Sequence, residues 1–457
     1  MGSFTNFPSA LAPILQANFL ERELEEGLDS ILAYRREAFQ ETVSARIGET
    51  LTRTRKSRKA PATVALTPST MTGLDNGLSP AAFSIEQYSF TMQNYGDTVD
   101  VQLMQELGGI ADQLIANSRN NGVQAAQSLE RIARSKLFGA YLGGNTIVIS
   151  GGTLNTTNAH VDDIRGFQNV LVNGVVTPVS GTNPITVSET ATSGAGVTQS
   201  LNVTTVTADG TNHSSAPDGI SGQIVFSAAT TPVAGDALVA VNAPKIFRPF
   251  AKLATTQLTG SDVLTLGMVE DAVAYLRDNG VPPMDDGTYH LILDNTSMRQ
   301  LFADQDFKVL YAGRDQSAEF RDGEVLRLLG VTYIPTTEAY VQQANTRVGG
   351  GAETPLVPVR TRRPILLGAE ALIQGNFEGM EIWLMRDGVN AIGDIMLINQ
   401  VAQIVRPPLD RLQQTLSLTW TWVGDFAVPS DNTATASIIP TASNALFKRC
   451  AVLEHAG

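Results

Sequence analysis

The spacing of apolar residues predicts two helices in the first third of the chain. Between residues 18 and 47, apolar positions such as Leu24 and Leu28 recur at helical intervals, with charged residues between them. Helical spacing returns from residue 98 to residue 142, and Asn120-Asn121-Gly122 marks a place where this helix could kink. We therefore expect an amphipathic helix over 18–47 and a long helix over 98–142.

Between these two helices the pattern is that of an extended hairpin. Residues 52–59 read Thr-Arg-Thr-Arg-Lys-Ser-Arg-Lys, and residues 60–82 are rich in Pro, Gly and Thr. A basic run followed by turn-forming residues is typical of an extended, solvated segment. Apolar and polar residues then alternate from Phe83 to Phe90, which predicts a returning strand. We expect residues 52–98 to form a long protruding hairpin.

The composition changes between about Gly143 and Ala243, where Thr, Ser, Gly, Val and Asn dominate. Short alternating runs are separated by turns of Gly, Asn and Asp, as in a set of short strands. The clearest of these runs are residues 169–176, 201–207 and 223–227. We interpret this stretch as an inserted β-rich domain.

After Pro244 the pattern becomes mixed, with helices and strands in turn. Helical spacing over residues 266–276 ends at Gly280, which two prolines follow. Leu416, Leu418, Trp420 and Trp422 alternate with small polar residues, which predicts a half-buried strand. Further expected elements are a short helix at 296–303 and strands at 289–293, 331–335, 380–385 and 394–405.

Composition and charge exclude several kinds of stabilising site and several locations for the protein. The 457 residues are enough to bury sizeable cores without cross-links. The single cysteine, Cys450, excludes an internal disulfide and a zinc site built from cysteines. Lys and Arg number 32 against 45 Asp and Glu, and this net charge of −13 does not attract polyanions. Because a signal peptide and a run of ~18 apolar residues are both missing, we expect a soluble, intracellular protein.

The sequence carries no motif that is typical of catalysis. The four histidines are far apart, and HExxH, P-loop, GxGxxG and GxSxG patterns are absent. His160 with Asp162 and Asp163 hints at a metal site, although a polar turn is the favoured interpretation. The sequence therefore predicts a protein that is not an enzyme and has no cofactor, catalytic residue or metal site.

The order of these elements resembles that of the major capsid proteins of tailed bacteriophages, which have the HK97-like fold. Three stretches carry the resemblance: residues 84–99, which lead into the long helix, residues 124–137 within it, and residues 312–337. The resemblance covers nearly all of the chain except the β-rich insert. It implies an α+β fold of the HK97-like capsid type with an inserted β-rich domain.

The resemblance also implies a division of the chain into segments. These are the N-arm with its amphipathic helix (1–51), the E-loop (52–98), the spine helix of the peripheral domain (99–144), the inserted β-rich domain (145–244), the axial domain (245–390), and the peripheral-domain strands with the C-terminal segment (391–457). The E-loop would lie over a neighbouring subunit, and the insert would sit on the outer surface of the shell.

The function implied by the resemblance is that of a major capsid protein. Such a chain would assemble into hexamers and pentamers, and these would form the icosahedral head shell around double-stranded DNA. The expected partners are further copies of the chain, a scaffolding protein, a portal and a decoration protein, and neither a membrane nor a specific DNA sequence would be bound. The protein would be assembled in the host cytoplasm and located in the virion.

Other classes of protein stay open from the sequence alone. One is an encapsulin-like compartment of the same fold, which would enclose enzymes rather than a genome. Another is a secreted β-rich surface or binding protein, to which the insert would be central. A third is an α/β enzyme that uses acids such as Asp294 and Asp304 without a recognisable motif.

Five positive charges stand at the base of the expected E-loop, in a chain that is acidic overall. They could bind DNA, form a solvated hinge, or contact acidic residues of an adjacent subunit. We favour the subunit contact. Opposite charges at a subunit border set the register of docking more than they add affinity, since a single exposed pair contributes only ~0–1 kcal/mol. The residues expected in this contact are Arg53, Arg55, Lys56, Arg58 and Lys59 on one subunit, and Glu21, Glu25 and Asp29 on the other.

Overall fold

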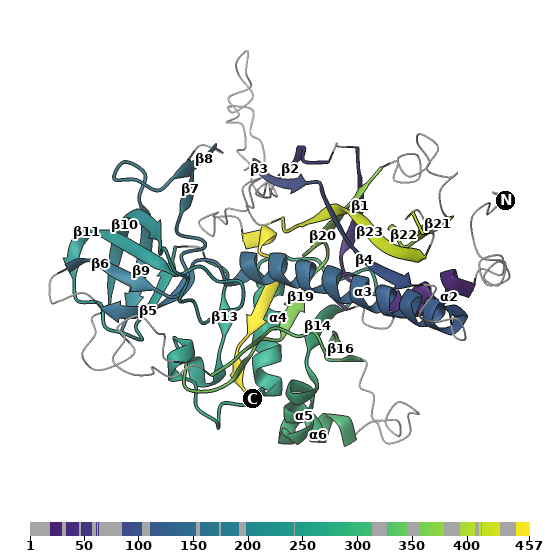
Figure 1. Ribbon diagram of the computed structural model, residues 1–457. Helices are drawn as coiled ribbons and strands as arrows, with labels where there is room; N and C mark the ends of the chain where they lie inside the picture. Colours follow the sequence, from purple (N-terminus) through teal and green to yellow (C-terminus); the bar gives the residue numbers. More distant parts are fainter. Residues whose placement is uncertain are drawn as a thin grey trace, which may run out of the picture.

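The protein is described by a computed structural model, which gives the chain an α+β fold (Figure 1). A long helix, α3 (Ile110–Leu142), runs across the middle of the molecule with strands around it. The structure describes residues 19–29, 33–44, 47–56, 61, 63, 85–102, 110–151, 156–172, 175–191, 198–241, 243–312, 327–344, 357–378, 394–406, 411–412, 414–429 and 445–457.

The N-terminal helix α2 (Phe19–Asp29) packs on α3 of its own chain, and two glycines allow the close approach. A Cβ atom on Gly27 would lie 2.6 Å from the carbonyl oxygen of Arg119, and one on Gly122 would lie 2.6 Å from that of Leu24. The residues that suggested a kink therefore serve a helix crossing, and α3 runs unbroken through them.

The helix predicted over residues 18–47 is wrong beyond Asp29. The buried carboxylate of Glu130, on α3, accepts the backbone N–H groups of Tyr34 at 2.8 Å and Arg35 at 2.9 Å. Because these amides bond to α3, the segment that contains them turns instead of continuing the helix. The chain then enters a strand, β1 (Phe39–Val43).

A sheet packs against α3, and its central strand is β23 (Thr415–Ala427). The predicted alternation is confirmed here, because Trp420 and Trp422 are buried in the same core as the apolar residues of α3. Polar contacts add to this packing: the indole N–H of Trp420 donates to Gln124 on α3 at 3.2 Å. The strands run in the order β1, β20 (Ile373–Phe377), β23, β22 (Val401–Arg406) and β21 (Asp394–Ile398), with β4 (Gln93–Gln102) also paired to β23.

This sheet corrects two of the sequence predictions. Residues 98–102 belong to strand β4 rather than to the long helix, which begins at Ile110. The strand expected over 394–405 is a hairpin of β21 and β22 that turns at Asn399 and Gln400, both with positive φ. The strand expected over 380–385 lies outside the described residues.

The base of the predicted hairpin is confirmed. Strands β2 (Thr50–Lys56) and β3 (Ile85–Thr91) pair antiparallel along their whole length. Phe90 is buried in a small cluster with Val43 and Ile373, and Leu51 packs against it, so the hairpin is anchored at this end. Nearly all of the chain between the strands lies outside the described residues. Residues 93–98, expected in the hairpin, are part of β4 in the body.

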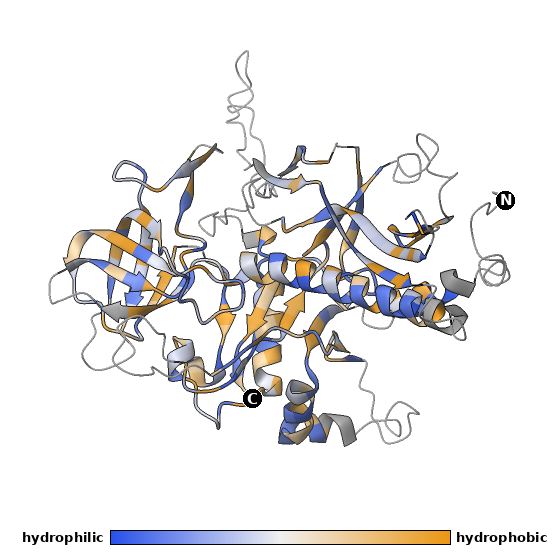
Figure 2. Cartoon of the chain, in the orientation of Figure 1, coloured by the Kyte–Doolittle hydropathy of each residue, from blue (hydrophilic) through white to orange (hydrophobic). Residues whose placement is uncertain are grey.

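The β-rich stretch contains a closed barrel with a core of its own, at the left of Figure 1. Its order is β10 (Gln199–Ala208), β11 (Gly222–Thr230), β6 (Thr156–Val161), β5 (Asn145–Gly151), β12 (Ala237–Ala240) and β9 (Ile185–Thr190). The single run expected over 169–176 is instead a hairpin of β7 (Asn169–Val172) and β8 (Val175–Pro178). Figure 2 shows hydrophobic residues along many of the barrel strands.

A second six-stranded sheet follows the barrel along the chain. Its order is β13 (Ile246–Phe247), β24 (Cys450–Leu453), β19 (Ile365–Leu367), β14 (Tyr289–Leu293), β16 (Val331–Pro335) and β15 (Arg327–Leu328). The predicted strands at 289–293 and 331–335 are confirmed. Cys450 is buried in this sheet, and its thiol is not in a disulfide.

Short elements complete the part of the chain that the structure describes. The helix expected over 266–276 is confirmed as α4 (Leu266–Asp278), which packs on this sheet, and α5 (Asn295–Ala303) matches the short helix expected at 296–303. The others are α6 (Gln305–Ala312), the sheet β17 (Val341–Gln342), β18 (Thr361–Arg362) and β25 (His455–Ala456), and the short 3-10 helices at Pro249–Ala251, Thr255–Gln257 and Ala445–Phe447.

The same substitution at two helical glycines should change stability in opposite directions. We expect Gly122→Ala to lower the free energy of unfolding by about 1–3 kcal/mol, because the new Cβ would overlap the backbone of α2. Gly267→Ala, where a Cβ meets no atom within 4 Å, should raise it by up to about 1 kcal/mol through better helix propensity. Urea unfolding followed by circular dichroism measures both. A stabilised Gly122→Ala protein would contradict the α2–α3 crossing.

Candidate assembly surfaces

The side chains that hinted at chemistry each have a structural partner. Asp163 forms an ion pair with Arg165, Asp162 accepts hydrogen bonds from a serine, and His160 lies 3.6 Å from a carboxylate oxygen of Asp209. Among the described residues there is no group of three or more His, Cys, Asp or Glu side chains placed to hold a metal ion. Within the same ranges, every helix is too short or too polar to cross a lipid bilayer.

The two acids considered for an α/β enzyme fix the ends of helices. Asp294 is the N-cap of α5, where it accepts the backbone N–H of Thr296 at 3.0 Å, and it also pairs with Arg362. Asp304 accepts the backbone N–H of Leu266 at 2.7 Å, at the start of α4. Both carboxylates therefore accept backbone N–H groups of a first helical turn, which have no partner within the helix.

A serine and a histidine are in contact, but solvent does not reach them. The Ser297 hydroxyl oxygen lies 2.8 Å from Nε2 of His455, and both residues are fully buried. Burial lowers the pKa of His455 to about 4, so its imidazole is neutral at pH 7. This contact joins α5 to the C-terminal strand and offers no surface to a substrate.

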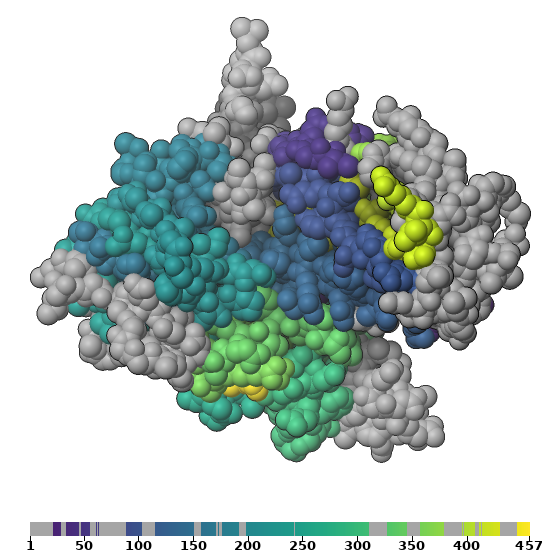
Figure 3. All heavy atoms as spheres, in the orientation of Figure 1, coloured from purple at the N-terminus to yellow at the C-terminus, as the bar shows by residue number. Residues whose placement is uncertain are grey.

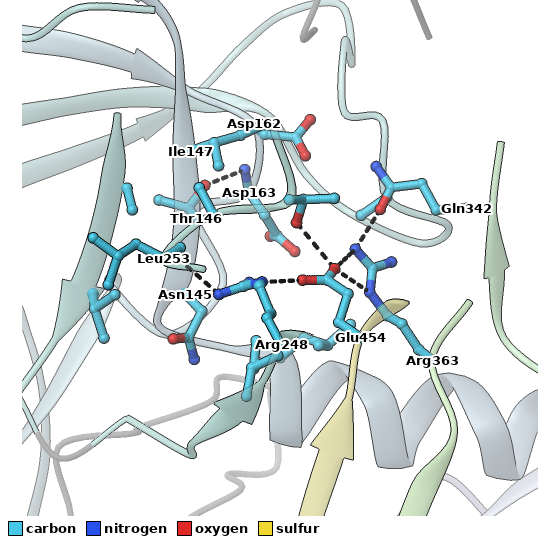
Figure 4. Close-up of a pocket in the computed structure, with 17 residues that line it drawn as sticks. Asn145, Thr146, Ile147, Asp162, Asp163, Arg248, Leu253, Gln342, Arg363 and Glu454 are labelled. Carbon is cyan, nitrogen blue, oxygen red and sulfur yellow. Dashed lines mark hydrogen bonds and ion pairs between the residues drawn. The ribbon is translucent and has the colours of Figure 1, made fainter. Parts of the chain in front are cut away.

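The buried carboxylate of Glu454 pairs with two arginines and so joins three distant parts of the chain (Figure 4). Oε1 of Glu454 accepts hydrogen bonds from Arg363 Nε at 2.9 Å, Arg363 Nη2 at 2.6 Å and the Thr255 hydroxyl at 2.9 Å. Oε2 pairs with Arg248. Burial alone would raise the pKa of Glu454, but the two guanidinium groups hold it at about 2.

A cavity of about 50 Å³ adjoins these ion pairs, between the barrel and the second sheet (Figure 4). Thr146, Asp162 and Asp163 line it from the barrel side. A volume of this size has room for a water molecule or two and is far below the roughly 300 Å³ at which small-molecule sites begin. The ion pairs therefore hold the fold together and do not form a substrate site.

The predicted basic run is described only in part. Arg53, in β2, forms an ion pair with Glu41 of β1 in the same chain, with 2.6 Å between Nε and Oε1. The backbone register of the hairpin places Arg55 opposite Glu86 and Lys56 opposite Ile85. Arg58 and Lys59 lie outside the described residues. The contact of this run with another subunit stays a prediction.

The proposed acidic partners lie on α2, which contributes Glu21, Glu25 and Asp29. Glu25 is exposed. On the same helix, Glu26 pairs with Arg119 of α3 at 3.0 Å, in an exposed ion pair. Within one chain, the described ion-pair partner of Arg53 is Glu41.

Large apolar side chains are exposed at several places in the described part of the chain, and the sequence pattern did not predict them. The most exposed are Phe250 at 87%, Leu412 at 73%, Val309 at 62% and Phe39 at 51%. They belong to different elements of the chain. Figure 3 shows one face of the molecule, on which the barrel in teal forms a lobe beside the blue residues of α3 and β4, with the green residues of the later chain below. Single exposed apolar residues are common, but several large ones indicate contacts with other molecules.

Comparison with solved structures gives a consistent class of neighbours. The structure is similar to the capsid of Ralstonia phage GP4, with a TM-score of 0.47 and 10% identity over 92% of this chain and 87% of that chain. It is also similar to the capsid of cyanophage P-SCSP1u, with a TM-score of 0.44 and 10% identity over 93% of this chain and 88% of that chain. The cyanophage Pam1 capsid has a TM-score of 0.43 and 10% identity, over 94% of each chain. All three of these solved structures are described as phage capsids.

Comparison by sequence adds no relatives. No protein-family model matches the chain, and no curated protein matches it.

The buried ion pairs of Glu454 give a prediction on acid stability. In the unfolded chain this carboxyl titrates near 4.5, and in the folded protein near 2. Its contribution to stability is therefore fully present above pH 4.5 and is lost as the pH falls toward 2, with a size of about 3 kcal/mol. We expect Glu454→Gln to lower the free energy of unfolding by about 3–5 kcal/mol at pH 7, because two buried arginines lose their partner.

Unfolding by urea between pH 7 and pH 2.5 measures this effect. The variant should lose stability less steeply than the wild type below pH 4.5. Glu370→Gln is the matched control, because Glu370 is half exposed in its ion pair with Arg449 and should matter by less than about 1 kcal/mol. Equal effects of the two substitutions would show that the Glu454 contact is not special.

Proposed function

We propose that this chain is the shell-forming protein of a phage capsid. The observation that carries the proposal is the β2–β3 hairpin, a two-stranded sheet anchored to the body at one end. Two strands alone are marginally stable in water, so a hairpin that extends beyond its anchor needs a surface to lie on. A neighbouring copy of the chain supplies that surface in a shell.

The scattered exposed apolar residues support the same function. Phe39 lies in β1 and Val309 in α6, and Leu412 lies between β22 and β23, so the exposed apolar residues come from separate parts of the chain. A shell subunit has several neighbours and buries several small patches at once. Contacts worth only about 4 kcal/mol each, near millimolar affinity alone, become strong together when several close simultaneously.

The resemblance noted in the sequence supports a finer proposal. The chain forms hexamers and pentamers that close into an icosahedral head around double-stranded DNA, with the β2–β3 hairpin as the E-loop over a neighbour. Residues 245–390 form the axial domain, and the barrel within 145–244 lies on the outer surface. A scaffolding protein, a portal and a decoration protein are the further partners, and assembly takes place in the host cytoplasm. The chain's role is structural, without an enzymatic step.

The charge of the chain fits a DNA container better than a DNA-binding protein. A net charge of −13 makes a wall that repels the genome rather than holding it in place. An encapsulin-like compartment is the second candidate, because the same hairpin would be needed there. A secreted β-rich binding protein is less well supported, since the barrel is joined to the body through buried contacts such as that between Tyr340 and the carbonyl oxygen of Pro217.

Assembly of the purified chain tests the proposed function. We expect the protein, expressed with its scaffolding protein, to form uniform closed shells in negative-stain electron microscopy, because it presents several weak contacts that can close together. Shells that contain DNA when isolated from infected cells would support the capsid, and shells that contain an enzyme would support the compartment. A chain that stays monomeric under all assembly conditions would contradict both.

The basic run gives a second test, which separates subunit contact from DNA binding. Arg55→Glu with Arg58→Glu should block or misdirect assembly while the subunit stays folded, and added salt should weaken wild-type assembly by screening the charges. The exchange Arg53→Glu with Glu41→Arg is the matched control, because it keeps the ion pair inside the chain and should still give shells. Variants that form normal shells but fail to retain DNA would replace the subunit contact by DNA binding.

A further inference from the structure

An exposed aromatic side chain stands on a strained turn directly after β13. Phe250 is 87% exposed and has φ 54° and ψ 30°, and the next residue, Ala251, has φ 54°. Two successive residues with side chains in the left-handed region are uncommon, and the cost is highest for a bulky residue. Strain of this kind persists only where the surrounding structure imposes it, and it is concentrated at functional sites.

The turn is held firmly from both sides. Arg248, just before it, bonds Glu454 inside and the carbonyl oxygen of Leu253 at 2.7 Å. Lys252 pairs with the buried carboxylate of Asp262. Leu253 is also half exposed. Residues 249–253 therefore form a rigid apolar projection, which we call the knob.

A hollow with a largely apolar lining lies between α4 and the β15–β16 hairpin. It has a volume of about 370 Å³ and is lined by apolar residues of α4 and the β15–β16 hairpin, such as Val273 and Leu329, with Glu270, Arg277 and Asp278 also in its lining. This volume falls within the roughly 300–1,000 Å³ of sites that take up a ligand or a side chain. The Tyr333 hydroxyl is buried and has no hydrogen-bond partner in the structure.

The rim of the hollow repeats the strain seen in the knob. Leu329 and Gly330 form the two-residue turn between β15 and β16, with φ 54° and 76°. Such a turn strongly favours Asn-Gly, because both residues have positive φ. Leucine at the first position adds strain, and its side chain is 45% exposed. Knob and hollow thus each carry a large apolar side chain at a place where a small or polar residue would be more stable.

The sheet order sets the two features apart. The knob directly follows β13, which is one edge strand of the six-stranded sheet, and the hollow is lined by β15 and β16 at the opposite edge. The knob and the hollow do not meet within one chain, because Phe250 is 87% exposed. They can meet between successive copies, as a head-to-tail contact that forms a ring when the rotation closes.

We propose that the knob of one copy, with Phe250 at its tip, inserts into the hollow between α4 and β15–β16 of the next copy. The aromatic ring fills apolar volume beside Val273 and Leu329. This rests on the proposed function, since it requires copies of the chain to assemble. Buried aromatic anchors in fitted hollows are typical centres of binding energy, and rigid ones lose little entropy on binding.

Substitutions that relieve the strain test the contact, because they should act in opposite directions on folding and on assembly. Phe250→Gly and Leu329→Asn should each raise the unfolding temperature of the unassembled subunit and raise the concentration for half assembly about tenfold or more. Gln400→Gly is the matched control: it relieves positive φ in the turn between β21 and β22, where no apolar side chain is presented, and should leave assembly unchanged. Dilute thermal unfolding and sedimentation velocity measure the two effects.

Mixing two variants tests the head-to-tail geometry. Ala274→Trp fills the hollow from an exposed position on α4 but keeps the knob, whereas Phe250→Gly keeps the hollow. Each variant alone should sediment as subunits, and an equal mixture should form one-to-one pairs that do not close into rings. Pairs in the mixture but not in either variant alone are the result that only complementary surfaces give.

Contrary results fall into separate classes. Wild-type protein that assembles, with both variants assembling at wild-type concentration, contradicts the knob contact and leaves the proposed function standing. Ala274→Trp with normal assembly beside a defective Phe250→Gly shows that the knob binds elsewhere and that the hollow takes another ligand. A wild-type chain that never assembles overturns the proposed function and this contact together.

Discussion

The arrangement of the molecule depends on one buried carboxylate. Glu454 directly follows β24, the strand next to the edge strand β13 of the second sheet. It pairs with Arg248, which follows the barrel along the chain, and with Arg363, which follows β18. These ions are buried, so leaving one of them unpaired would cost several kcal/mol, and the three chain segments must come together or none can be buried. The barrel is held beside the body for the same reason. The contact also holds Arg248 at the base of the knob, so the strain at Phe250 is imposed from the interior.

The long helix α3 gives the other half of the molecule its frame in a comparable way. Its apolar face packs against β23, while Glu130 binds the backbone at Tyr34 and Arg35 and Gly122 admits α2. Helix, sheet and N-terminal segment are therefore fixed by side chains of one element. A rigid body of this kind can carry a hairpin, a knob and a hollow in fixed relative positions, which contacts between identical copies require.

The elements that the sequence predicted well are those whose pattern is local. The apolar runs at 289–293 and 331–335 and the alternation around Trp420 describe buried strands on their own, and the structure has them as expected. The helix over 18–47 failed because its end is set by Glu130, about 95 residues away in sequence. Closure of the barrel depends on pairings of equally long range. Among the candidate residues, the basic run could be predicted from its charges. Phe250 could not be predicted, because the pattern of residues around it indicates neither its positive φ nor its exposure.

Strain at an exposed apolar residue has a thermodynamic consequence for assembly. A subunit that keeps Phe250 and Leu329 in the left-handed region is less stable alone than one with glycine or asparagine there. The backbone at these residues is already held in the folded subunit, so a neighbour that buries their side chains does not have to order it. Individually weak contacts of this kind can form and break while a shell grows, yet hold it when all of them are closed. Marginal stability of the free subunit and stability of the closed assembly therefore have a common cause in the fold.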